Sequence, residues 1–407
     1  MKDKSLRFEL LMISTWFLGV MAVKFTLPFL PTIAEQLHAS PTLVKYTITL
    51  FLFGKASGML AFGPLSERYG RRRFMLIGLV LFAIGNMLAF YATSIGFLLF
   101  ARLLQGFGVS ATVLMGRAMI NDKHQNNQAA VVFSHVFFAA SIIISFLPML
   151  GSLISSYFEW HITFVIMACY SLVVFIFYFF FLEETHETHN HLALDLPKIM
   201  SYYKIIISHP LFLGYVLCSI FMIAGESAFN TASSFLLIKT YGVTKNTFGL
   251  LITCLAIGHL IGTLICGRLV KKYNMVNMMG TGVIILAIST TFMATLVQLG
   301  HASVFMIIVP MIIFYVGTGF IMTITAVGAV VPFPKMIGIS SSASLLLNFS
   351  FSALSSAIVS HLSTKTAGPV SLLIACCGVS AFLSWYFLIV PGYSMKTENE
   401  AISPALS

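Results

Sequence analysis

The sequence predicts an all-α membrane protein with twelve transmembrane helices, arranged as two related six-helix bundles around a central cavity. Of its 407 residues, 58% are hydrophobic and only 9% are charged, whereas soluble proteins carry about a quarter charged residues. The chain also holds twelve apolar runs long enough to cross a bilayer, which takes roughly 20 residues each. A weak internal repeat relates its two halves. The runs lie near residues 10–34, 44–66, 73–92, 95–120, 129–154, 161–182, 209–237, 245–270, 276–299, 303–328, 337–361 and 367–391.

The first run begins like a secretion signal, because Lys2, Lys4 and Arg7 precede it. Its apolar stretch is too long for a signal peptide and lacks a small-residue cleavage site, so we expect a retained helix. Basic residues accumulate in cytoplasmic loops. With both termini inside, 15 of the 23 Lys and Arg residues are cytoplasmic. The outer loops then hold Lys45, Lys239, Lys245 and Lys365.

This distribution predicts a multi-pass protein embedded in the lipid bilayer, with both termini in the cytoplasm. The membrane we expect is the inner membrane of a bacterium. The net charge of +10 follows from the same topology, so it does not indicate nucleic-acid binding.

A long polar stretch at 183–208 divides the chain into a first bundle at 1–182 and a second bundle with its tail at 209–407. Residues 63–70 and 267–274 align at an offset of 204, with Gly, Leu, a basic residue and Tyr in register. Both segments follow the second helix of their half, where a duplication would place them. The stretch also contains His186, His189 and His191, which we interpret as solvated loop, so we expect no metal site.

The most specific motif is GPLSERYGRRR at 63–73. It resembles the motif G-x-L-[SA]-D-[RK]-x-G-R-[RK] of major facilitator transporters, whose parallel six-helix repeats surround a site near mid-membrane. Small residues permit close helix approach, and the charges can form pairs that hold one access state. Glu67 stands where the motif usually has Asp, and Asp122 is the expected partner of the arginines. The expected gate residues are Gly63, Glu67, Arg68, Gly70, Arg71, Arg117 and Asp122.

The segments 27–40, 62–73, 102–108 and 116–122 together resemble the Bcr/CflA branch of drug-proton antiporters. In that family a helix-four arginine, here Arg102, is implicated in proton coupling; a structural arginine bonded to carbonyls is the alternative. The chain departs from the family at two places. Lys24 stands where helix one usually carries an acid, and the fifth-helix antiporter motif is reduced to Pro148-x-x-Gly151-Ser152, which weakens the inference of proton antiport.

Ionisable side chains within a span are costly and usually face a cavity or a partner. Lys24, Lys55, Arg102 and Glu226 are such residues, and Glu226 is the only acid deep in a predicted span. An offset of 204 makes Glu226 nearly the repeat mate of Lys24, so we expect an ion pair across the cavity in one state. A static pair that only joins the halves is the alternative.

Polar residues on helices seven and eleven predict the rest of the lining. The expected substrate-binding residues are Lys24, Lys55, Glu226, Asn230 and Asn348. The expected proton-coupling residues are Glu226, Arg102 and His259, since an imidazole exchanges protons near neutral pH. His259 ranks below Glu226, because a lone histidine within a span is more often a packing residue.

We therefore expect a secondary active transporter that works as a monomer, with protons as the coupling ion, and that exports a small organic solute. The cations favour an anionic metabolite such as a polycarboxylate siderophore, whereas the family resemblance favours cationic or neutral drugs. A membrane-embedded enzyme would need a nucleophile with its base, or clustered histidines at the membrane ends. The sequence shows neither pattern, so we expect no enzyme and no cofactor. A transporter-like ligand sensor is the alternative from another class.

Overall fold

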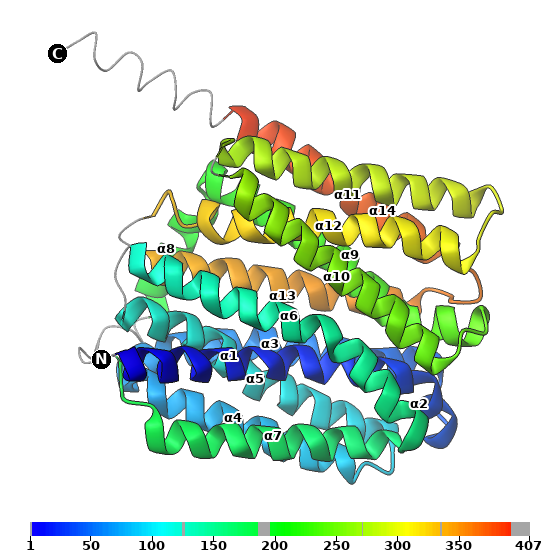
Figure 1. Cartoon of the computed structure of the whole chain (residues 1–407), viewed down its shortest axis with the longest axis horizontal. Coiled ribbons are helices and arrows are strands. Elements are labelled where there is room, and N and C mark those ends of the chain that lie inside the picture. Colours follow the sequence, from blue (N-terminus) through cyan, green and yellow to red (C-terminus); the bar gives the residue numbers. More distant parts are fainter. Residues whose placement is uncertain (1, 124–126, 186–195, 271, 334–335, 392–407) are drawn as a thin grey trace. The chain divides into compact units, whose positions relative to one another are not determined.

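The computed structural model describes residues 2–123, 127–185, 196–270, 272–333 and 336–391. In this described part every regular element is a helix (Figure 1). Twelve helices there are long and apolar enough to cross a membrane, which confirms the predicted fold class. His186, His189 and His191 lie outside the described residues.

The first half of the chain contains eight helices in its described residues. They are α1 (Lys2–Lys24), a short 3-10 turn (Leu27–Phe29), α2 (Leu30–Gln36), α3 (Pro41–Tyr69), α4 (Arg71–Phe90), α5 (Ile95–Lys123), α6 (Asn127–Tyr157) and α7 (Trp160–Phe181). The described second half follows with α8 (Leu196–Ile207), α9 (Pro210–Ser234), a π-helical segment (Phe235–Thr240), α10 (Lys245–Leu269), α11 (Met275–Gln298), α12 (Val304–Gly328), α13 (Ile337–His361), α14 (Gly368–Ser384) and a second π-helical segment (Trp385–Ile389).

The start and the end of α3 follow from local sequence. The Ser40 hydroxyl accepts a hydrogen bond from the Leu43 backbone N–H at 3.3 Å, which satisfies a donor that the first helical turn leaves open. Pro41 fits the first helical position because its amide nitrogen has no hydrogen to lose there. The helix ends at Gly70, whose φ of +99° is a conformation that residues with a side chain rarely adopt.

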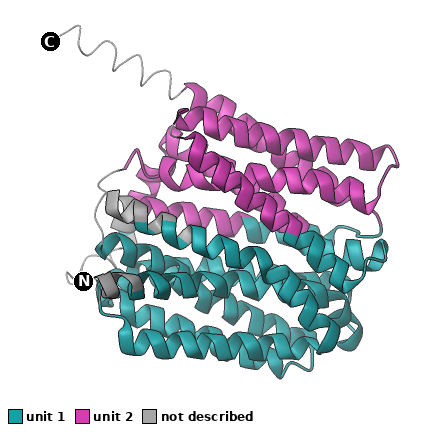
Figure 2. Ribbon diagram, in the orientation of Figure 1, with its two compact units in different colours: residues 1–199, 230–253, 352–365 teal, residues 200–229, 254–351, 366–407 magenta. Residues whose placement is uncertain are grey.

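The described chain forms two compact units (Figure 2). Unit 1 contains residues 1–199, 230–253 and 352–365, and unit 2 contains residues 200–229, 254–351 and 366–407. Unit 1 therefore takes in parts of α9, α10 and α13. The predicted division of the chain at 183–208 stays a prediction.

The packing pairs within each unit repeat. In unit 1, α4 packs on α5 and on α7, which are the third helix of the first half against its fourth and sixth. In unit 2, α11 packs on α12 and on α14, the corresponding helices of the second half. This agreement fits the internal repeat that the alignment of 63–70 with 267–274 indicates.

Helix α5 also packs closely on α3 in unit 1. A side chain at Gly106 would collide with the backbone of α3: its Cβ would lie 2.8 Å from the Phe51 carbonyl carbon and 3.0 Å from the Lys55 nitrogen. Glycine therefore sets the spacing of these helices, as small residues do in other membrane bundles. Outward-facing apolar side chains such as Phe180 and Phe305 are about 70% exposed, as expected for a surface in contact with lipid.

Candidate functional site

Lys24 is the last residue of α1 and is only 8% exposed. Its ammonium donates a hydrogen bond to Oδ1 of Asn230, on α9, at 2.9 Å. Two of the predicted substrate-binding residues are thus brought together within unit 1. Because the amide oxygen is neutral, this bond leaves the positive charge of Lys24 without compensation from Asn230.

Lys55 lies on α3 and is as buried as Lys24. Its ammonium points at α1, where a Cβ added to Gly19 would lie 3.3 Å from Lys55 Nζ. Arg117 on α5 lies close enough for its charge to act on Lys55, and its guanidinium sits 5.7 Å from the centre of the Trp16 ring. Helices α3 and α5 of unit 1 therefore each place a basic side chain beside α1.

Arg102 is deeply buried on α5, at 1% exposure, among neutral partners. Nε donates to the Thr47 carbonyl oxygen at 3.3 Å, Nη1 donates to Gln105 Oε1 at 2.8 Å, and the guanidinium lies 4.8 Å from the centre of the Phe51 ring. Nη2 has no hydrogen-bond partner among the described residues. These contacts tie α5 to α3 as a structural arginine would, and the proton-coupling role of Arg102 stays a prediction.

Unit 2 places Glu226 and His259 against consecutive turns of α12. The Tyr315 hydroxyl donates to Glu226 Oε1 at 3.4 Å. One turn further along α12, Thr318 Oγ1 lies 2.8 Å from His259 Nδ1. The predicted ion pair of Glu226 with Lys24 stays a prediction, and the structure gives each of the two residues another partner.

Asn348, on α13, accepts a hydrogen bond at Oδ1 from Ser219 Oγ of α9 at 3.0 Å. The side chain is buried, and this bond joins two helices of unit 2. Its predicted role as a substrate ligand is not tested by this contact.

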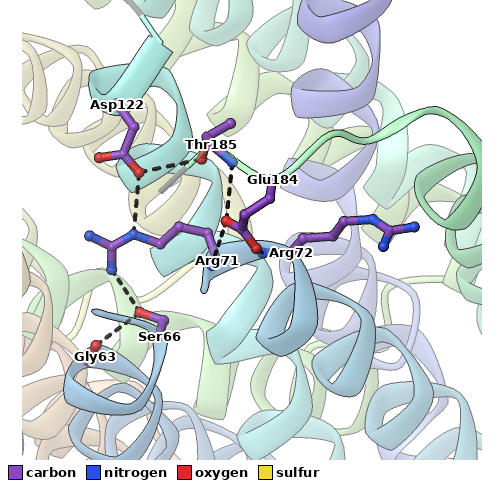
Figure 3. Close-up of polar contacts among 7 residues, drawn as sticks. All are labelled: Gly63, Ser66, Arg71, Arg72, Asp122, Glu184 and Thr185. Atoms are coloured by element: carbon purple, nitrogen blue, oxygen red, sulfur yellow. Dashed lines mark hydrogen bonds and ion pairs between the residues drawn. The ribbon is translucent and has the colours of Figure 1, made fainter. Parts of the chain in front are cut away.

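The motif at 63–73 spans the last turns of α3 and the first turn of α4, and Arg71 holds it together (Figure 3). Its Nε lies 3.3 Å from Asp122 Oδ2, at the end of α5. Its Nη1 donates to Ser66 Oγ at 2.7 Å, and Ser66 in turn donates to the Gly63 carbonyl oxygen. The structure thus brings together the predicted pair of Arg71 and Asp122.

Other predicted gate residues lie nearby. Glu67 and Arg68 occupy the last turn of α3, where the Arg68 guanidinium lies 5.2 Å from the centre of the Tyr69 ring.

Glu184 is a further residue of this region that sequence reasoning misses. Its two carboxylate oxygens accept the backbone N–H groups of Arg71 at 2.9 Å and Arg72 at 3.1 Å, so the carboxylate caps the positive end of the α4 dipole. Thr185 donates to Asp122 Oδ2 at 3.3 Å. Figure 3 shows the resulting chain of contacts from α3 through α4 and α5 to the residues after α7.

Comparisons with known proteins agree with this architecture. The sequence profile described as "Major Facilitator Superfamily" matches residues 12–236 and 215–405. The chain belongs to the Major Facilitator Superfamily. Members of this superfamily are membrane transporters of small molecules and not enzymes, so the chain is a multi-pass membrane transporter.

Two curated members of the superfamily match most of the chain. A protein of Haemophilus influenzae named "Bicyclomycin resistance protein homolog" is 27% identical over 372 residues, which cover 90% of this chain and 92% of that protein. "Multidrug resistance protein D" of Escherichia coli is 22% identical over 386 residues, covering 94% and 96% of the two chains. These names support the resemblance to Bcr/CflA-type efflux transporters.

Among solved structures, the D-xylose-proton symporter superposes with a TM-score of 0.75 at 16% identity and covers 94% of this chain and 97% of its own. This likeness is one of fold alone.

In this superfamily member, Arg71→Ala and Glu184→Gln are each expected to slow solute turnover severalfold while leaving solute affinity nearly unchanged. Their bonds link α4 to its neighbours at one end of unit 1, and a gate at this position would bias the access states without touching solute. The measurement compares the initial rate of solute transport with the affinity of the purified protein for the same solute. Arg73→Ala is the matched control, because Arg73 belongs to the same basic run but is exposed. An equal loss of binding in both variants would remove the gate assignment.

Proposed function

We propose that this transporter is a proton-coupled exporter of a small organic solute and that it prefers anions, such as polycarboxylate siderophores. It would act as a monomer in a bacterial inner membrane with both termini in the cytoplasm. Membership of the superfamily and the names of its efflux relatives support export. The preference for anions goes beyond those relatives and depends on the charges of this chain.

The observation that carries the anion preference is Lys24. It stands where the resembling family usually has an acid, it is buried, and it is bonded to the amide of Asn230. Lys55 and Arg117 are further basic side chains on the neighbouring helices α3 and α5. An anion entering such a partly desolvated site gains Coulomb energy, whereas a cationic drug would be repelled.

Glu226 supports the proton-coupling part of the proposal. A carboxyl group within a span is costly to keep charged unless a partner stabilises it, and the Tyr315 hydroxyl that donates to Glu226 is neutral. Binding of an anion near Glu226 would favour its protonated form. Solute and proton would thereby be linked through one carboxyl group.

Proteoliposomes with an imposed pH gradient test the proposal. We expect polycarboxylates to accumulate only when the lumen is more acidic than the outside, because outward proton flow would drive solute inward. Glu226→Gln should abolish the dependence on the gradient while leaving solute exchange at equilibrium. Accumulation of cationic or neutral drugs in place of anions would favour the multidrug efflux suggested by the relatives' names. Solute binding without flux would instead identify a ligand sensor.

A further inference from the structure

The end of unit 1 remote from the 63–73 motif is closed by segments from the second half of the chain. Helix α3 is 29 residues long, so its two ends lie about 44 Å apart. Its second and third turns contact the end of α13 and Leu362 just after it, and the π-helical segment Phe235–Thr240 lies against α2. We call this region the Lys45 end.

Lys45 is the most buried cation at this end. Its place in the sequence predicts an outer-loop lysine, but the structure buries it in the second turn of α3, at 2% exposure. Its ammonium donates to three backbone carbonyl oxygens: Val359 at 3.3 Å, Ser360 at 3.3 Å and Leu362 at 2.9 Å. Helix α13 ends at His361, so these carbonyl groups lie at its C-terminal end, where Val359 also accepts the backbone N–H of Leu362 at 3.1 Å. The positive charge also complements the negative end of the helix dipole.

The surrounding contacts also join α3 to α13. Thr49 Oγ1 lies 2.8 Å from Ser356 Oγ, and Ser356 is also bonded to Thr231 of α9 at 2.9 Å. Tyr46 Oη lies 2.8 Å from His361 Nε2 at the rim. These contacts join hydroxyl groups and an imidazole, whereas the bonds of the Lys45 ammonium are charge-assisted and belong to the stronger class.

A second charged contact at this end is an ion pair of Glu35 with Lys239. Its side chains are 62% and 51% exposed, and exposed ion pairs contribute little to stability. The Glu35–Lys239 ion pair lies at the exposed rim of this end, whereas the bonds of Lys45 lie in its buried interior.

We infer that Lys45 is the gate residue that keeps the Lys45 end shut, by clamping the last carbonyl groups of α13 against α3. Opening this end requires residues 352–365 to leave α3, which breaks all three bonds at once and returns the ammonium to water. Lys45 therefore sets how often this end opens, although it need not touch the solute. The inference rests on the transport role of the superfamily and is independent of the proposed anion preference and proton coupling.

Labelling of a cysteine at position 356 tests this role. Ser356→Cys changes one atom at a buried position of the clamp, and a membrane-impermeant maleimide reaches it only when the Lys45 end opens. Site-resolved mass spectrometry of the full chain in nanodiscs gives its labelling rate. The native Cys218 and Cys266 are buried in unit 2 and report unfolding, so they must stay protected in every variant.

In this background, Lys45→Met is expected to raise the labelling rate about tenfold, the size expected for losing hydrogen bonds to a charged group. Lys45→Arg keeps the charge and should restore most of the protection. Lys239→Met removes the exposed ion pair and should change the rate less than about twofold.

A parent-like labelling rate in Lys45→Met, or an equal acceleration in Lys239→Met, would overturn the gate role of Lys45. If Lys45→Met also exposes Cys218 and Cys266, Lys45→Gln decides, because it keeps a hydrogen-bond donor while removing the charge. This second variant must label at least threefold faster than the parent, and a parent-like rate refutes the inference.

Discussion

Gly106→Leu is expected to remove most of the folded protein from the membrane. The carbonyl group of Phe51 and the backbone nitrogen of Lys55 occupy the space that even a Cβ would need. Backbone atoms cannot rotate away as a side chain can, so α3 and α5 would have to separate. Overpacking in a core typically costs about 1–3 kcal/mol, and here the separation would also disturb the Arg102 bonds between the same two helices.

The measurement is the yield of monodisperse protein after extraction in a mild detergent, together with its thermal unfolding. Gly96→Leu is the matched control, because Gly96 lies in the first turn of the same helix and a Cβ there meets nothing within 4 Å. We expect the control to extract like the parent. Similar yields and unfolding temperatures for both variants would show that the spacing of α3 and α5 is not set at Gly106.

Lys24→Ala is expected to reduce transport of anionic solutes at least tenfold and to change that of neutral solutes little. At an effective dielectric constant of about 20, two unit charges 4 Å apart interact by about 4 kcal/mol. Even a third of this energy corresponds to about a tenfold change in affinity. Initial rates in proteoliposomes, measured with polycarboxylates and with neutral compounds of similar size, give the comparison.

The chain offers a sharp control for the charge of Lys24. Asn230→Ala removes the same hydrogen bond between α1 and α9 but keeps the ammonium, so anion transport should fall far less than in Lys24→Ala. Lys24→Arg should preserve the anion preference. If cationic drugs are the best solutes and Lys24→Ala has no effect, the anion preference is wrong.

The helices were predictable because hydropathy alone decides them. The runs predicted at 245–270 and 303–328 match α10 and α12 almost residue for residue, since a long apolar segment in lipid must satisfy its own backbone hydrogen bonds. The π-helical segment Phe235–Thr240 was not predicted. It changes the hydrogen-bond spacing within one continuous apolar stretch and leaves no mark on hydropathy.

The polar contacts were predictable only where a motif fixed both partners. Asp122 was expected beside the arginines of 63–73, and it lies 3.3 Å from Arg71. Lys45 meets Val359, 314 positions away, and Glu184 meets the Arg71 amide 113 positions away. Nothing near Lys45 or Glu184 in the sequence reveals such a partner. From sequence alone, Lys45 resembles a loop lysine and Glu184 resembles a solvated acid of the linker.

Helix α3 carries Lys45 close to its first residue and Ser66 close to its last, and Pro64 falls only in its final turns. A rod about 44 Å long acts as a lever. Pivoting it by about 10° around its midpoint would displace each tip by roughly 4 Å, which exceeds the length of a hydrogen bond. Modest pivoting could therefore disengage the contacts at one tip while pressing those at the other together. A compound bound beside either end of α3 would block this pivoting. Inhibitors of this transporter therefore need not occupy the solute site.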